Sequence, residues 1–380
     1  MISVDPVAPL LSGRADSPLS TVESWTRIKD QASKMGVAPL IADIARPNLP
    51  LREQLWCDDV LTQSWVSHEI SLSALKRILI LLNEAGVPAL ALKGPVLALR
   101  YYSPPYLRKP SVDLDLAVRE EDLERACAAL VASGYKLAGS ILDAKRFSHH
   151  VVLTHADYCP VELHFRLSHG VSGIRVDDLF SRAIRFELPR GSSALTLSPA
   201  DEALHLILHL VQDRFALLFH LVELRRIWAA TPLPVREEAI ERGIAYGFAA
   251  TLKLADAAYR ACWNEPLLPE SIELPKTWLH WRLNENLYRA MQKNASATVE
   301  NSLTTRLRGR WFDLQVTDTP KAAFEMLRAM FWIACQNLKR SGALSAAGTA
   351  AAGTDRVTLV INPSSATPPT PNAQAASCSR

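Results

Sequence analysis

The strongest chemical signal in the sequence is a pair of aspartates that alternate with apolar residues. The alternation runs from residue 112 to residue 118, with Asp113 and Asp115 at its polar positions. Because successive side chains of a strand point to opposite faces, the two carboxylates share one face, with Cα atoms roughly 7 Å apart. Like charges so close repel each other, and partial burial adds to the cost, so stability alone does not explain the pair. The plainer alternative is a half-exposed sheet whose outer positions are polar.

A third acid occupies the same kind of position in a second alternating run, at residues 159–165. Glu162 and His164 fall on one face of this predicted strand, opposite its apolar residues. If the two strands are neighbours, Glu162 joins Asp113 and Asp115, and a divalent cation offsets the repulsion. Carboxylate oxygens suit Mg²⁺ or Mn²⁺, and two such ions roughly 3.5–4 Å apart can clamp an in-line phosphoryl displacement. Glu162 could ligate one ion or serve as general base for an acceptor hydroxyl.

A glycine turn upstream of the acids is a candidate for binding phosphate. Lys93 and Gly94 follow a predicted strand at 87–92 and precede a predicted helix at 96–102. Glycine there lets backbone N–H groups approach an anion, and Lys93 could reach a triphosphate oxygen. The basic residues between this turn and the acids could neutralise the triphosphate or could be solvated surface charges: Arg100, Arg108 and Lys109.

The elements that position these residues combine strand-like and helix-like patterns, which predicts an α+β fold with a small mixed sheet. A helical pattern over 51–85 stops at Gly86, a residue type that is common just after a helix. Ser198 and Pro199 mark another helix start, with the serine as cap and the proline in the first turn. Further helices are predicted at 120–133, 215–230, 235–263, 277–296 and 320–340, and a further strand at 150–154.

The same patterns divide the chain into five regions. They are a disordered N-terminus at 1–20, an N-terminal helical region at 21–86, an α/β core at 87–190, a helical domain at 191–340 and a disordered tail at 341–380. Disorder is predicted for the two ends because their many small and polar residues leave little surface to bury.

Composition narrows the classes of function. With 48% apolar residues the chain can bury a sizeable core, and a net charge of +3 does not by itself indicate nucleic acid or an anionic membrane as a partner. The apolar runs are shorter than the roughly 20 residues that cross a bilayer, and the first residues lack the pattern of a signal peptide. Six cysteines without a C-x-x-C pair suit free thiols in a reducing compartment, so a cytoplasmic protein is expected.

Taken in order, these motifs resemble the bacterial family of uncharacterised nucleotidyltransferases, which belongs to the nucleotidyltransferase superfamily. The resemblance covers about residues 75–230 and includes Lys93-Gly94, Tyr101-Tyr102-Ser103-Pro104, Arg108, Asp113-Leu114-Asp115, Val161-Glu162-Leu163-His164 and the apolar run at 204–210. It implies a nucleotidyltransferase sheet, with Asp113, Asp115 and Glu162 as the catalytic, metal-binding acids. Gly94, with Lys93, would stand at the nucleotide-binding turn, and Arg108 and His164 are further candidates for contacts with the nucleotide. The chain has Gly94-Pro95 where most superfamily members have Gly-Ser or Gly-Gly.

The predicted function is transfer of a nucleoside monophosphate from a nucleoside triphosphate, expected to be ATP, to an unidentified acceptor. Mg²⁺ or Mn²⁺ would be the cofactor. The resemblance implies a small-molecule or peptide acceptor, since some members of the family are associated with peptide natural-product pathways. Neither a membrane nor a nucleic acid is expected as a partner. Two alternatives stay open: a catalytically inactive binding or regulatory protein on the same scaffold, and a metal-dependent phosphodiesterase.

Two histidines four residues apart, His205 and His209, share a helix face at a spacing that can hold zinc. The sequence offers no evident third ligand. A helix face turned toward the nucleotide, or a pair of partly buried structural histidines, is therefore favoured over zinc. Asp213 and Glu223 are predicted to be acids on a helix surface.

Overall fold

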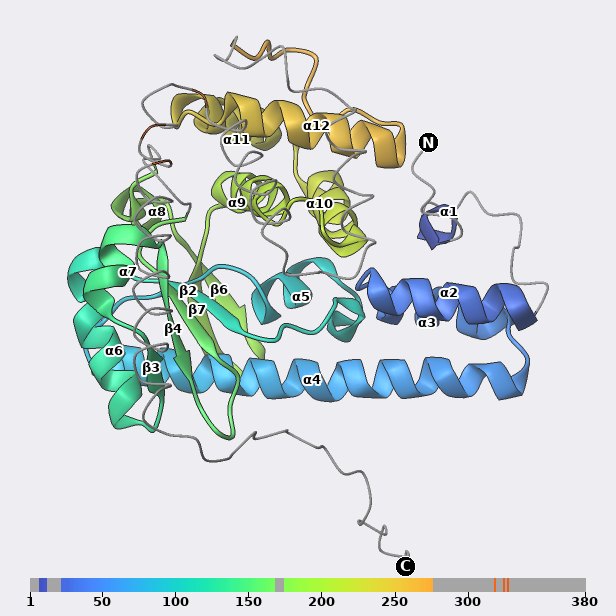
Figure 1. The fold of residues 1–380 in the computed structure, drawn as a ribbon, viewed down its shortest axis with the longest axis horizontal. Helices are drawn as coiled ribbons and strands as arrows, with labels where there is room; N and C mark the ends of the chain where they lie inside the picture. The colour runs from blue at the N-terminus through green and yellow to red at the C-terminus, as the bar shows by residue number, and fades with distance from the viewer. Residues whose placement is uncertain are drawn as a thin grey trace, which may run out of the picture. The chain divides into compact units, whose positions relative to one another are not determined.

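A seven-stranded mixed sheet organises the protein, with the strand order β3-β4-β5-β2-β1-β7-β6 (Figure 1). The computed structural model describes residues 7–11, 22–167 and 174–275, together with Asp318, Phe324 and Leu327. All of them belong to one of the two units into which the chain divides, Met1–Phe331. The strands are β1 (Leu90–Ala91), β2 (Leu114–Ala117), β3 (Lys136–Ala138), β4 (His150–Thr154), β5 (Val161–His164), β6 (Ile184–Leu188) and β7 (Ser192–Thr196).

Two of the strand pairs are parallel, β2 with β5 and β1 with β7, and the other pairs are antiparallel. A parallel pair needs a long crossover connection, because the chain must return to the starting edge before it can pair. Between β2 and β5 that connection contains β3, β4 and two helices. The two central strands that bear the acidic residues are therefore neighbours in space although they are well separated in sequence.

Twelve α-helices surround the sheet in the part of the chain that the structure describes. They are α1 (Val7–Leu11), α2 (Val22–Lys34), α3 (Ala38–Ala45), α4 (Leu51–Glu84), α5 (Pro95–Tyr101), α6 (Leu123–Ala132), α7 (Ile141–Phe147), α8 (Val176–Ser181), α9 (Pro199–Gln212), α10 (Leu218–Ala230), α11 (Leu233–Ala245) and α12 (Ala249–Trp263). Ser198 caps α9 as predicted, since its hydroxyl accepts a hydrogen bond of 3.3 Å from the amide of Asp201. Gly86 follows the end of α4 with a φ of 67°, a conformation that glycine adopts without strain.

Two buried clusters hold the layers together, and they lie on opposite faces of the sheet. On one face α4 and α6 pack against the strands, for example through Ile78 against the layer that contains Leu116 and Leu163. On the other face the helices α9, α10 and α12 form a second cluster, which includes Ala117 of β2 and Ile207 of α9. Figure 1 shows the long α4 on one side of the sheet and α9 to α12 on the other. The polar positions of β2 therefore face the α9 and α10 layer.

The predicted α+β class is confirmed, but the sheet is larger than predicted. The strands β3, β6 and β7 were missed, and β7 extends the sheet beyond residue 190, where the predicted core ended. All three lie at or near an edge of the sheet and carry exposed residues. The strands β3 and β7 lack a clear apolar alternation, whereas β6 does alternate and was overlooked. The predicted helix at 235–263 is two helices, because the chain turns at Gly247 with a φ of 81°.

One residue that the strand alternation predicts to be buried is exposed. Val112 was expected to point inward from a strand, but β2 begins only at Leu114 and Val112 is 73% exposed. Residues 112 and 113 form a bend before the strand. Because the alternation continues through this bend, the sequence pattern alone did not separate it from the strand.

Several predictions fall on residues outside the described ranges. They include the helix at 277–296, nearly all of the helix at 320–340, the tail at 341–380 and most of the N-terminal stretch, although Val7–Leu11 forms α1 with Val7 buried. The described cysteines, Cys57, Cys127, Cys159 and Cys262, are free thiols. In the same ranges, no helix has both the length and the apolar character needed to cross a membrane.

Candidate active site

The pairing of β2 with β5 brings two of the predicted acids together. In this parallel register Asp115 lies directly opposite Glu162, one step along from the pair Leu114 and Val161. Leu114 and Leu163 point into the cluster under α4, so alternation places Asp115 and Glu162 on the face that α9 and α10 cover. The side chain of Asp115 is 9% exposed and that of Glu162 is 25% exposed. Two carboxylates thus lie side by side at a largely enclosed position.

The third predicted acid, Asp113, lies in the bend before β2, where the negative charges of Asp115 and Glu162 act on it. Burial raises the pKa of Asp113, and the negative charges of Asp115 and Glu162 raise it further. Lys93 and Lys109 act in the opposite direction but do not restore its usual pKa. Asp113 therefore lies within range of the charges of Asp115 and Glu162, although the donor atoms that lie within 4.8 Å of one another belong to Asp115, Glu162 and His164.

Lys93 and His164 provide the positive and hydrogen-bonding partners of Asp115. The Lys93 ammonium lies 3.3 Å from Asp115 Oδ1, and His164 Nε2 lies 3.0 Å from the same oxygen. Burial alone would raise the pKa of Asp115, but Lys93 and His164 bring it well below its usual value. His164 Nε2 is also 3.4 Å from Glu162 Oε2, so this one imidazole bridges the two carboxylates. Burial opposes protonation of His164, yet its hydrogen bonds to Asp115 and Glu162 raise its pKa.

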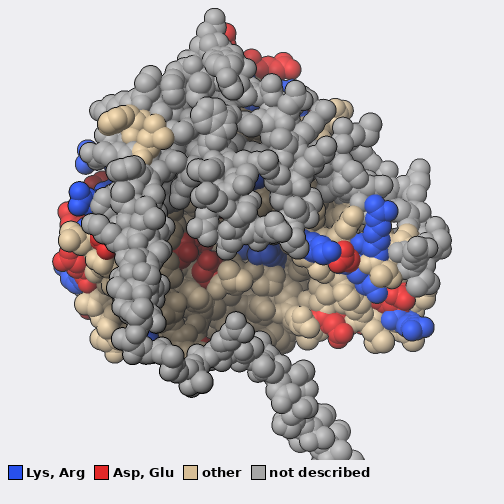
Figure 2. Space-filling view, viewed as in Figure 1, with Lys and Arg blue, Asp and Glu red and all other residues tan. Residues whose placement is uncertain are grey.

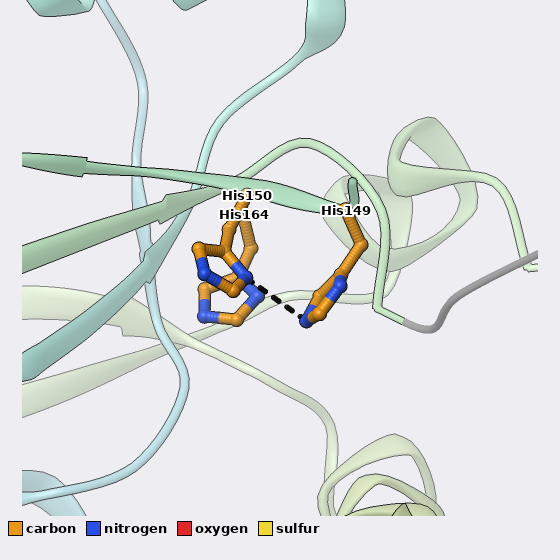
Figure 3. Close-up of side chains that lie close together, drawn as sticks. All are labelled: His149, His150 and His164. Atoms are coloured by element: carbon orange, nitrogen blue, oxygen red, sulfur yellow. Dashed lines mark hydrogen bonds between the residues drawn. The ribbon is translucent and has the colours of Figure 1, made fainter. Parts of the chain in front are cut away.

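Three histidines crowd the end of the sheet beside Glu162 (Figure 3). His150 of β4 pairs directly with His164 of β5, and its Nδ1 lies 3.0 Å from Nε2 of His149. His150 Nε2 is 3.8 Å from Glu162 Oε2, and burial lowers the pKa of His150. Glu162 therefore has an imidazole on each side, with His164 between it and Asp115 and His150 on the neighbouring strand β4.

The glycine turn lies next to the acids, as predicted. The amide of Leu92 donates a hydrogen bond of 3.1 Å to the carbonyl of Asp115, which brings Lys93 and Gly94 beside β2. Gly94 has φ 67° and ψ −128°, a combination open essentially to glycine alone. A Cβ atom there would lie 3.3 Å from Ser111 Oγ, so a side chain would narrow the approach to the turn.

Two of the basic residues proposed to neutralise phosphate are already paired with buried acids. Arg108 is 7% exposed, and its Nε and Nη2 donate to the two carboxylate oxygens of Glu223. Arg100 Nη1 donates to Glu202 at 2.7 Å. The prediction that Glu223 is a surface acid is therefore wrong, since α10 turns it inward, where Arg108 neutralises it. The structure does not bring the Arg108 guanidinium into the carboxylate group, although its charge acts on Asp115.

Lys93 and Lys109 are the cations whose charges act on Asp113. Burial, followed by the charge of Arg108, lowers the pKa of Lys109, whose ammonium lies 5.7 Å from the ring centre of Phe219. Figure 2 shows acidic side chains, with basic ones beside them, in a hollow near the centre of this face. Opposite charges thus meet at one recess, as a site for a metal-bound triphosphate requires.

The helix face with His205 and His209 does turn toward this recess. His205 is 3% exposed, and burial, together with the charge of Lys93, lowers its pKa well below the usual value. Sequence reasoning missed two residues near it: Asp213 was taken for a plain surface acid, and His220 drew no attention. The spacing of His209 and Asp213 is visible in the sequence, but the approach of His220 depends on how α9 and α10 meet.

Comparison with known families agrees with this geometry. The model of a family described as uncharacterised nucleotidyltransferase matches residues 22–263, which includes every strand, the glycine turn and all three acids. This match spans more than half of the chain, so the protein belongs to that family. No curated protein matches the chain significantly. Family membership indicates a transferase that uses a nucleotide.

Proposed function

We propose that the protein is a metal-dependent nucleotidyltransferase. It transfers a nucleoside monophosphate from a nucleoside triphosphate, with ATP the expected donor, to a small-molecule or peptide acceptor. The observation that best supports the proposal is the register of β2 and β5, which sets Asp115 opposite Glu162, with Asp113 close enough for both charges to raise its pKa. A fold gains nothing from such a concentration of negative charge unless a cation binds there.

The donor set fits Mg²⁺ or Mn²⁺. Asp113, Asp115 and Glu162 offer hard carboxylate oxygens, which these ions prefer, and Asp115 and Glu162 lie side by side in the sheet, with their charges acting on Asp113. When bound there, the metal would supply charge stabilisation for the phosphoryl group and for the pyrophosphate that leaves.

The chain's own residues would orient the reactants and handle the proton. Lys93 would exchange its contact with Asp115 for a triphosphate oxygen, and the backbone at Gly94 would approach the phosphates. His164 would keep the carboxylates of Asp115 and Glu162 in fixed orientations. An acceptor oxygen would attack the α-phosphorus and displace pyrophosphate, and its proton would pass to a base, for which Glu162 is the candidate.

Position-specific labelling of the nucleotide tests this function. The full-length protein would be incubated with Mg²⁺ and either α-labelled or γ-labelled ATP, with mixtures of small molecules and peptides as acceptors. Transfer of the α label, with release of pyrophosphate, is expected. Transfer of the γ label would instead identify a kinase, and hydrolysis of an added phosphodiester without transfer of either label would identify a phosphodiesterase. Absence of nucleotide binding in the wild type would favour the inactive scaffold.

A further inference from the structure

A second group of metal-ligating side chains lies on the helices that cover the sheet. His209 stands in the last turn of α9, Asp213 ends that helix, and His220 lies near the start of α10. Asp213 Oδ2 is 3.0 Å from His209 Nδ1 and 3.2 Å from His220 Nε2. The candidate ligand atoms of these three residues all lie within 4.8 Å of one another. We call them the α9–α10 cluster.

The turn between the two helices brings the cluster together at some cost to the backbone. Arg214 and Phe215 have φ values of 53° and 58°, in the left-handed region that residues with a Cβ avoid. Burial of the Phe215 ring, which is 2% exposed, anchors this turn and offsets the strain. As a result α10 returns against the end of α9, and His220 stacks on His209 with ring centres 5.1 Å apart and planes 30° apart.

The distances within the cluster match the spacing of donor atoms around one metal ion. Bonds of 2.0–2.1 Å place neighbouring donor atoms of a tetrahedral zinc site roughly 3.3 Å apart, close to the two observed separations. His209 Nδ1 is buried, yet it has no partner with the geometry of a hydrogen bond, although the carboxylate oxygen is only 3.0 Å away. The three donor atoms therefore lie close enough together to share one ion.

We propose that His209, Asp213 and His220 bind a divalent transition-metal ion of the zinc class. Two imidazoles and one carboxylate are the donors that zinc takes in three-residue sites, with a fourth position left for water or a substrate atom. The side chains are 21%, 41% and 16% exposed, so the ion and its fourth ligand can enter from solvent. This site shares no residue with the carboxylate group of β2 and β5, and it does not depend on nucleotidyl transfer.

A neighbouring histidine supports a ligand at this end of α9. His205 lies one turn before His209, with ring centres 6.2 Å apart, and neither of its ring nitrogens has a hydrogen-bond partner although it is 3% exposed. A buried imidazole without a partner is unfavourable, and such groups are common where a ligand or a metal-bound water completes the site. His205 is too far from the cluster to be one of its three ligands, but it can donate to a water in the fourth position.

Zinc binding to the full-length protein tests the proposal. The wild type, freed of metal, would be titrated with Zn²⁺ by calorimetry and with Co²⁺ by absorption, which reports tetrahedral coordination. His220→Gln removes one ligand and is expected to weaken zinc binding at least about 100-fold, more than the loss of an outer-shell partner. Two matched controls should keep the wild-type affinity: His155→Gln, in the turn between β4 and β5, and His150→Gln, beside Glu162.

These variants distinguish zinc binding at the α9–α10 cluster from zinc binding beside Glu162 and from misfolding. His209→Gln should repeat the loss, and zinc should raise the melting temperature of the wild type but not of either variant. A wild type that binds no zinc, a His220→Gln protein that binds as the wild type does, or a loss that falls on His150→Gln would each overturn the proposal. Asp115→Asn, in contrast, should abolish transfer of the α label and leave zinc affinity unchanged, so a failure of either idea is recognised separately.

Discussion

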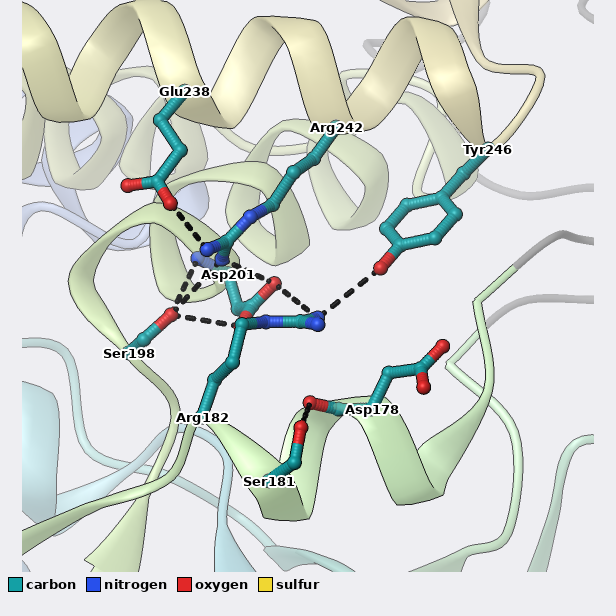
Figure 4. A network of polar contacts seen from close by, with 8 residues as sticks. All are labelled: Asp178, Ser181, Arg182, Ser198, Asp201, Glu238, Arg242 and Tyr246. Carbon is teal, nitrogen blue, oxygen red and sulfur yellow. Dashed lines mark hydrogen bonds and ion pairs between the residues drawn. The ribbon is translucent and has the colours of Figure 1, made fainter.

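Buried acids in this protein fall into two groups, which differ in what neutralises them. Asp201, with its side chain 1% exposed, lies between two guanidinium groups, with Arg182 Nε at 2.8 Å and Arg242 Nη1 at 2.9 Å. Ser198 donates a further hydrogen bond of 2.7 Å to it, and Tyr246 holds Arg182 in place (Figure 4). Asp113, Asp115 and Glu162 have no arginine among their closest partners, and their neighbours are one another, Lys93 and imidazoles.

This difference indicates which acids stabilise the fold and which are available for chemistry. Guanidinium pairs satisfy a carboxylate completely and leave it no capacity for a ligand. Glu223 belongs with Asp201, since Arg108 donates to both of its carboxylate oxygens, whereas Arg100 donates to Glu202 through Nη1. A lysine and an imidazole can be displaced by a stronger cation, so the acids of β2 and β5 keep that capacity. We therefore expect mutations of the arginine-paired acids to lower stability, and mutations of the acids of β2 and β5 to lower activity.

The largest effect is expected for Asp115→Asn on activity. Removing this carboxylate should lower the rate of nucleotidyl transfer about 1,000-fold, which corresponds to roughly 4 kcal/mol of lost transition-state stabilisation. The melting temperature should fall less than it does when a buried arginine loses its partner, because the lost contact with Lys93 is offset in part by relief of the repulsion that Asp115 exerts on Asp113 and Glu162. The measurement is transfer of the α label, with Asp157→Asn as the control, since that side chain is 82% exposed at a distant turn. An unaltered rate would mean that the two groups of acids do not differ as proposed.

The reverse pattern is expected for Glu223→Gln, which acts on stability. It leaves the Arg108 guanidinium buried without a counter-charge, and breaking such a pair typically costs about 3–4 kcal/mol. Urea unfolding would measure the loss against Glu187→Gln, which breaks an exposed pair with side chains 74% and 72% exposed and should cost less than about 1 kcal/mol. Equal losses of unfolding free energy in the two variants would show that Arg108 does not need Glu223. Arg108 would then again be a candidate for binding phosphate.

The sequence predicted which face of each strand carries the acids, because strand alternation is a local property, but it did not show that the two strands pair. Asp115 and Glu162 each sit between apolar residues, so the face they share follows from their own strands once the two strands pair. The glycine turn and the caps of α4 and α9 are local in the same sense. The fold class followed from these elements, although the strands β3, β6 and β7 and the short helices α7 and α8 were not predicted.

The partners of the arginines could not be predicted, because they depend on contacts between distant segments. Arg108 and Glu223 are separated by 115 residues, and a basic residue near a phosphate site looks the same in sequence whether it meets a ligand or a buried acid. The α9–α10 cluster shows the same limit, since His220 reaches Asp213 only through the turn at Arg214 and Phe215. For this reason Glu223 was predicted to lie on a helix surface, although it is buried.

A buried acid that is only partly compensated should make stability depend on pH. Burial raises the pKa of Glu202 to about 7, against 4.5 in the unfolded chain, although Arg100 and Tyr101 oppose the shift. Between these values the folded state holds a proton that the unfolded state has lost, so the free energy of unfolding falls as pH rises, by about 3 kcal/mol in total. Urea unfolding from pH 4.5 to pH 8 should show this slope in the wild type and not in Glu202→Gln. Parallel pH curves for the two proteins would place Glu202 among acids that arginine fully neutralises.

The smallest effect is expected for Lys93→Met, which removes the displaceable cation from the acids of β2 and β5. Loss of one charged contact to a triphosphate should raise the KM for ATP about tenfold, equivalent to roughly 1.4 kcal/mol. Because Lys93 lowers the pKa of Asp115, its removal raises that pKa, and the acidic limb of the kcat/KM profile should move to higher pH. Lys34→Met, at a side chain that is 70% exposed, is the control. A higher KM with an unmoved acidic limb would mean that Lys93 binds the nucleotide without tuning Asp115, and that His164 alone keeps this carboxylate ionised.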